Sequence, residues 1–238
     1  MKRNLARCSR FAAGILAALM ILPAVALAGP PLICHTINIG SAASLPWSSD
    51  TWNLSGKENY DLNRLAGDTL ALLDANTPVL VRMETLRRAT LYAQRDPKIA
   101  KELLLKLSAR STANDRDALA AFDFGYLIEC YKQANWLFEK SANGYVRSER
   151  PNPAMNLDGY AWVEKAIGLR GPDPQMEFAA ALITIDSSLE SHQIHTQKAM
   201  AGAAGDPLLA QNLSSHFSSG DRGETISQIL ARTTTAKN

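Results

Sequence analysis

Beyond its first 28 residues the chain lacks long hydrophobic runs, basic clusters and known catalytic motifs. Without a later apolar stretch of ~20 residues, we expect no membrane span in the mature chain. Without a run of five or more Lys and Arg residues, we expect no nucleic-acid partner. The G-x-S-x-G, P-loop, G-x-G-x-x-G and H-E-x-x-H motifs are absent, which removes the strong arguments for an enzyme without excluding one.

Residues 1–28 have the features of a secretory signal peptide. Four basic residues and no acidic ones precede an apolar stretch over 11–22, and Ala26-Leu27-Ala28 forms a small-x-small cleavage site before Gly29. We expect cleavage near Ala28-Gly29 and a secreted or periplasmic protein, with the periplasm favoured. The whole chain has 25 basic and 23 acidic residues, a net charge of +2. Cleavage removes four basic residues, so the mature chain has 21 against 23 and a net charge of −2.

Cysteine is scarce: Cys8 leaves with the signal peptide, so only Cys34 and Cys130 remain. Two cysteines in an oxidising compartment predict one disulfide, which would pin the N-terminal segment to the helical body. Closing so long a loop should contribute about 4–5 kcal/mol in the chain-entropy model. The alternative is two separate thiols, with Cys130 as an ordinary buried residue on the apolar side of a helix.

The mature chain divides into an irregular segment over 29–56 and a single helical domain over 57–238. Pro, Gly and Ser dominate the first part, which we expect to be a loop without helix, able to lie over a groove. Apolar residues then recur every three or four positions. Asp96-Pro97, Asp173-Pro174 and Asp206-Pro207 each place a capping aspartate before a proline at the first helical position.

These signals predict an all-α fold without strands, built as a helix-hairpin array of roughly eight or nine helices, either α-solenoid-like or an orthogonal bundle. The long helix is expected over 114–141 and the longest loop over 142–156. The next helix should run from Leu157 to Leu169 with Asn156 as its cap, and a last short helix should begin near Asp221.

Two fragments, Phe122–Ile128 and Tyr160–Trp162, are similar to parts of the tetratricopeptide repeat motif. The Ala and Phe residues that this motif has further on do not fall at the required offsets after either fragment. The chain is therefore not assigned to that family.

His192 and His195 are the metal-binding candidate, because a spacing of three places both imidazoles on one helix face. The alternative is an ordinary solvated face in a Ser- and Gln-containing stretch. The adjacent pair Cys34-His35 offers a nucleophile or a metal ligand, but neighbouring side chains in an extended loop point apart. No cofactor is predicted.

A binding surface is predicted at two places. Trp47 and Trp52 in the N-terminal segment are candidate anchors for a partner or a sugar face, unless they fill the core. Tyr145, Arg147 and Arg150 lie in the longest loop, where exposed binding residues often occur.

The sequence as a whole predicts an exported helical-repeat-like protein of non-catalytic function, binding a protein or peptide partner along a concave face. One alternative is a metal-dependent enzyme or metal-binding factor that uses His192 and His195. The other is a glycan or small-ligand binding module that uses Trp47 and Trp52.

Overall fold

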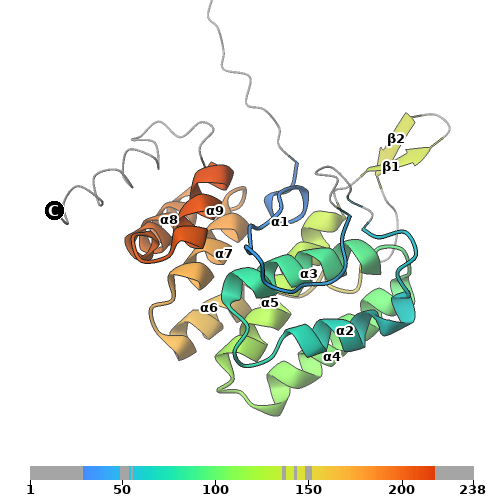
Figure 1. Cartoon of the computed structure of the whole chain (residues 1–238), viewed down its shortest axis with the longest axis horizontal. Helices are drawn as coiled ribbons and strands as arrows, with labels where there is room; N and C mark the ends of the chain where they lie inside the picture. The colour runs from blue at the N-terminus through green and yellow to red at the C-terminus, as the bar shows by residue number, and fades with distance from the viewer. Residues whose placement is uncertain are drawn as a thin grey trace, which may run out of the picture.

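The computed structural model describes residues 29–48, 54, 56–135, 138–141, 144–147 and 152–217, and these form an array of helices with one small hairpin (Figure 1). The predicted all-α array is therefore confirmed. Nine α-helices lie within these ranges, with a 3-10 turn over Leu62–Arg64 before the second: α1 Pro31–Cys34, α2 Leu65–Leu72, α3 Val79–Ala93, α4 Pro97–Ala113, α5 Ala118–Ala134, α6 Gly159–Arg170, α7 Pro174–Thr184, α8 Leu189–Ala203 and α9 Pro207–Phe217.

The three predicted Asp-Pro helix starts are confirmed. Helices α4, α7 and α9 begin at the prolines, and the aspartate before each accepts a hydrogen bond from a backbone N–H of the first turn. For Asp96 the donor is the backbone N–H of Lys98, at 2.8 Å. The carboxylate satisfies a donor that has no partner within the helix and favours the helix dipole.

Helix α5 lies at the centre of the array and contacts α1, α3, α4, α6 and α7. Its closest approach is to α6, where Gly125 and Gly159 face each other. A Cβ atom on Gly125 would lie 2.6 Å from the Gly159 carbonyl oxygen, so a side chain would force the helices apart. In the part of the chain that the structure describes, no helix is long and apolar enough to span a membrane.

The sequence prediction of a helix over 114–141 is wrong at both ends, and the expectation that no strand forms is wrong too. Helix α5 starts only after Asp117, whose carboxylate accepts the Ala120 N–H at 2.9 Å, and it ends at Ala134. Strands β1 (Phe138–Ser141) and β2 (Gly144–Arg147) then pair antiparallel, with Phe138 opposite Arg147. The pairing needs only a short connection, and the turn dipeptide Asn143-Gly144 in the sequence was its signal.

Helix α6 also begins later than predicted. Asp158, not Asn156, is the cap, and its carboxylate accepts the Ala161 N–H at 3.0 Å. Asp158 sits three residues before the donor it satisfies, the usual geometry for a capping carboxylate. The signal peptide and the last helix, predicted from Asp221, lie outside the described residues.

The N-terminal segment was predicted to contain no helix, but one helical turn forms as α1. Pro31 occupies its first position, and the Pro30 carbonyl accepts the N–H groups of Ile33 and Cys34. Burial then alternates from residue 36 to 40, as in a strand with one face on the core. The segment lies against the helices (Figure 1), and its buried apolar side chains join the common core: Leu32, Ile33, Ile37, Ile39 and Leu45.

Candidate ligand-binding pocket

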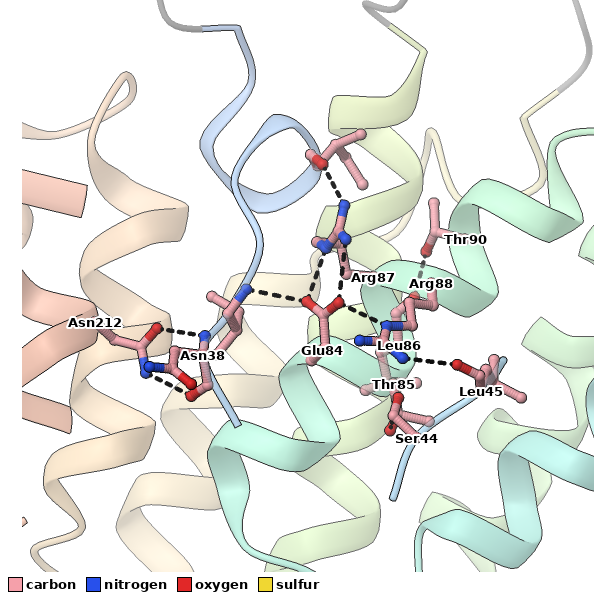
Figure 2. Close-up of polar contacts among 12 residues, drawn as sticks. Asn38, Ser44, Leu45, Glu84, Thr85, Leu86, Arg87, Arg88, Thr90 and Asn212 are labelled. Carbon is pink, nitrogen blue, oxygen red and sulfur yellow. Dashed lines mark hydrogen bonds and ion pairs between the residues drawn. The ribbon is translucent and has the colours of Figure 1, made fainter. Parts of the chain in front are cut away.

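Side chains of α3 hold the backbone of the N-terminal segment, with Glu84 at the centre of the contacts (Figure 2). The Glu84 carboxylate accepts the Ile37 N–H at 3.0 Å and also pairs with Arg87 and Arg88 at 2.8 and 2.7 Å. The two arginines in turn donate to backbone carbonyls, Arg87 to Ile33 and Arg88 to Leu45. Glu84 and Arg87 are fully buried, so their charges balance each other inside the core.

Helix α9 holds the same segment further along, through the amide of Asn212. Its oxygen accepts the Asn38 N–H at 2.8 Å, and its nitrogen donates to the Asn38 carbonyl at 2.8 Å (Figure 2). One buried side chain thus pairs with both backbone groups of one residue, as a neighbouring strand would. The contact fixes residues 35–38 beside α9.

A surface cavity of about 330 Å³ lies where residues 35–38 meet α9. Three of its lining residues come from the segment and three from the helix, and all carry polar side chains. Asn38 and Gln211 cross the junction, since the Asn38 amide donates to the Gln211 oxygen at 2.7 Å. The lining residues are His35, Thr36, Asn38, Gln211, Ser215 and His216.

The imidazole of His216 is held in a single tautomer. Its Nδ1 lies 2.8 Å from the Asn212 carbonyl oxygen, which can only accept, so Nδ1 carries the proton and Nε2 keeps its lone pair. Burial lowers the pKa of His216 to about 4, so the ring is neutral at neutral pH. Nε2 is closed to solvent and has no hydrogen-bond partner among the residues that the structure describes.

His35 stands beside His216, with ring centroids 5.6 Å apart and the planes tilted by 55°. Burial, and after it the positive charge of Arg87, lower the pKa of His35. Both imidazoles therefore line the cavity as neutral groups without formal charge, and the His216 Nε2 lone pair lies buried beside it.

Comparison with known proteins gives no match. No family model fits the chain, and neither a curated protein nor a solved structure is significantly similar to it.

The predicted metal ligands His192 and His195 lie on α8, both buried against α7. His195 contacts the Glu177 carboxylate through Nδ1 and the Tyr160 hydroxyl through Nε2, the latter at 2.8 Å. His192 uses Nδ1 to donate to the Ala181 carbonyl at 2.9 Å. Over the described ranges no three His, Cys, Asp or Glu side chains gather as a metal site would need. Metal binding by this pair stays a prediction that would cost His195 its present contacts.

The predicted surface residues do not meet at one site. Trp47 is partly buried and packs edge-on against Tyr92, with centroids 5.6 Å apart, while the Arg87 guanidinium lies 5.3 Å from its ring. It thus belongs to the contact of the N-terminal segment with α3. Tyr145 and Arg147 lie on β2, where only the backbone is described, and Trp52 and Arg150 lie outside the described residues.

The predicted disulfide does not form in this structure: Cys34 and Cys130 are free thiols. Helix α1 does pack on α5, but the Cys34 sulfur turns back toward Gly29, where an added Cβ would meet it at 2.6 Å. Cys130 is buried in α5, and burial raises the pKa of both thiols. The bridge stays a prediction for the exported chain. Thiol titration of the denatured, non-reduced mature protein tests it, since two reactive thiols would contradict it.

The sequence offered little sign of this pocket. In the sequence His35 is notable only as the neighbour of Cys34, and no motif or spacing singles out His216. Asn38 and Asn212 are 174 positions apart, so no spacing rule links them. The pairing depends on the way α9 packs beside the N-terminal segment.

Proposed function

We propose that this protein is an exported, non-catalytic binding protein, and that the cavity between residues 35–38 and α9 holds its ligand. The observation that carries the proposal is the lone pair on His216 Nε2, buried beside a polar cavity and left without a partner in the described part of the chain. A buried acceptor without a hydrogen bond costs about 1–3 kcal/mol. A ligand that donates to it would recover that cost on binding.

The cavity favours holding a ligand over converting one. Efficient proton transfer needs a group whose pKa lies near the working pH. The pKa of His216, about 4, is too low for that at neutral pH. The other lining side chains are amides and hydroxyls apart from His35, whose pKa is lowered as well.

A panel of uncharged amides, alcohols and sugars, screened by ligand-observed NMR against the mature chain, tests the proposal. Thr36 is exposed at the cavity rim, so Thr36→Trp should fill the cavity without disturbing the core and should abolish binding. Thr112→Trp on the exposed face of α4 is the matched control and should bind as the wild type does. Equal binding to the Thr36 and Thr112 variants, or no hit on the wild type, would contradict the proposal.

Export is supported by the signal-peptide features of residues 1–28. The cavity has no bearing on it. Mass spectrometry of the chain recovered from the envelope or medium of an expressing bacterium should find an N-terminus at Gly29. Recovery of the chain from the cytoplasm with residues 1–28 still attached would refute export and leave the binding proposal standing.

Binding of a protein or peptide partner is the second candidate function, and one observation favours it. Side chains from α3, α5 and α9 hold the main chain of the N-terminal segment, since Gln133 of α5 also accepts the Leu32 N–H at 2.8 Å. A partner's peptide would have to replace that segment. Leu32, Ile33 and Leu45 are fully buried, each contributing about 1.5–3 kcal/mol, so the incoming peptide needs comparable apolar residues.

A synthetic peptide of residues 29–48 separates this candidate from the first. If a peptide can displace the N-terminal segment from the helices, the labelled peptide should bind the mature chain, and a scrambled peptide of the same composition should not. Absence of binding at high peptide concentration would show that the segment is a permanent part of the fold.

A further inference from the structure

We infer that the ligand of the cavity is a neutral, polyhydroxylated molecule of monosaccharide size. The inference rests on the proposed function, because it names the chemical class that the same cavity would take. The residues that line this cavity do not include Trp47 or Trp52, the tryptophans from which the sequence predicts a sugar face.

None of the described residues that line the cavity carries a formal charge at neutral pH, which argues against a charged ligand. An ion that leaves water needs an opposite charge or several hydrogen bonds to offset its lost hydration. A cation would meet no carboxylate among the described residues that line the cavity. An anion would meet no lysine or arginine among the described lining residues, and His216 takes up a second proton only near pH 4.

The hydrogen-bonding groups that remain are of mixed kind. Asn38 uses its amide N–H for Gln211 and its oxygen for the Gly40 N–H. The Gln211 oxygen is thereby engaged, which leaves its N–H groups to donate to a ligand. Ser215 donates its hydroxyl proton to the Asn212 carbonyl, so its oxygen is turned into an acceptor.

A ligand that fits such a lining must donate and accept at several points around one cavity. A hydroxyl group does both from a single oxygen, and neighbouring hydroxyls on a ring present that ability in several directions. A primary amide offers one acceptor and one donor group on one side only. An apolar molecule would cover the polar lining without satisfying it.

The size of the cavity sets an upper limit on the ligand. At about 330 Å³ it lies at the lower end of the range of small-molecule sites, roughly 300–1,000 Å³. Thr36, Gln211 and Ser215 are exposed, so the cavity is open to solvent on one side. One sugar ring, with any continuation outside, fits these dimensions.

Binding should move the two imidazoles. His216 Nε2 is closed to solvent, so a ligand hydroxyl reaches it only after one of the two neighbouring rings turns. The side-chain resonances of both His35 and His216 should therefore shift on binding. Those of His195, which Glu177 and Tyr160 hold at a distance from the cavity, should stay in place.

Titration of the mature chain with glucose, galactose, mannose and N-acetylglucosamine, followed by histidine NMR and calorimetry, is the test. Glucuronate, glucosamine, acetamide and Zn²⁺ serve as the charged, amide and metal probes. At least one neutral sugar should bind and shift both His35 and His216. Gln211→Ala removes the amide donor and also the acceptor of the Asn38 amide, and should weaken binding roughly tenfold. Gln197→Ala on the exposed face of α8 should leave binding unchanged.

The outcomes separate the two levels of the proposal. If acetamide, a charged sugar or Zn²⁺ shifts the two histidines and no neutral sugar does, the ligand class is wrong and the cavity is still a binding site. If no probe of any class shifts them, both the class and the proposed function fall. Sugar binding that Gln211→Ala leaves unchanged would place the sugar elsewhere and overturn the inference.

Discussion

Glu84 is the residue on which most of the polar contacts of the N-terminal segment converge. It is fully buried, with Arg87 and Arg88 as its ionic partners and the Ile37 N–H as its backbone partner. Such a group contributes less through attraction than through the cost of removing it, because its loss leaves buried guanidinium charge unpaired.

The variant Glu84→Gln keeps the shape of the side chain and removes its charge. We expect it to lower the free energy of unfolding by about 3–5 kcal/mol, measured by urea denaturation at pH 7. Glu102→Gln is the matched control: its partner is Lys106 on the exposed face of α4, where both side chains are nearly half exposed, and little change is expected. Equal effects of the two variants would show that the segment is not held by the buried charge.

His216 should make the stability of the fold depend on pH. Its pKa is about 4 in the folded chain and about 6.5 in the unfolded chain, so the unfolded state binds more protons between those values. Stability therefore falls as pH is lowered from about 6.5 to about 4, by roughly 2–3 kcal/mol for this group alone. Urea unfolding of His216→Phe at pH 7 and pH 4.5 should show a smaller loss than the wild type. An identical loss in both chains would assign the pH dependence to other groups.

At the scale of helices and strands, the features that depend only on residues close together in the sequence could be predicted. An Asp-Pro pair caps a helix whatever surrounds it, and all three such pairs do so here. The hairpin after α5 was not predicted, because the apolar pattern of the helix continues beyond its end and was given more weight than the local turn signal. The cap of α6 was missed because Asn156 and Asp158 are both good caps, and the packing of Gly159 on α5 selects the second.

The crossing of α5 and α6 gives a prediction at this scale. Gly125→Ala places a methyl group 2.6 Å from the Gly159 carbonyl oxygen, and the overpacking should cost about 1–3 kcal/mol in stability. Gly168→Ala on α6 is the control, since nothing lies within 4 Å of its added methyl group. That variant should gain up to about 1 kcal/mol from helix propensity. Thermal melting followed by circular dichroism should move in opposite directions for the two variants, and a rise for both would mean that the close approach is absent.

At the scale of the whole molecule, the cavity belongs to two ends of the described chain. Three of its lining residues come from the segment 35–38 and three from α9, so neither end forms the site alone. The residues that line the cavity could not be identified from sequence spacing, because the two histidines that meet there are separated by most of the mature chain. The arrangement also means that loosening either end should empty the site before the rest of the array unfolds.

Asn212→Ala tests that local coupling directly. The change removes both hydrogen bonds to the Asn38 backbone and leaves a small cavity at a fully buried position. Hydrogen exchange measured by mass spectrometry should show faster exchange in peptides that span residues 35–40, while those from the centre of α5 keep the wild-type rate. Gln197→Ala should change neither. Faster exchange throughout the array would instead mean that the segment and the helices unfold as one unit, because then no opening of the segment precedes global unfolding.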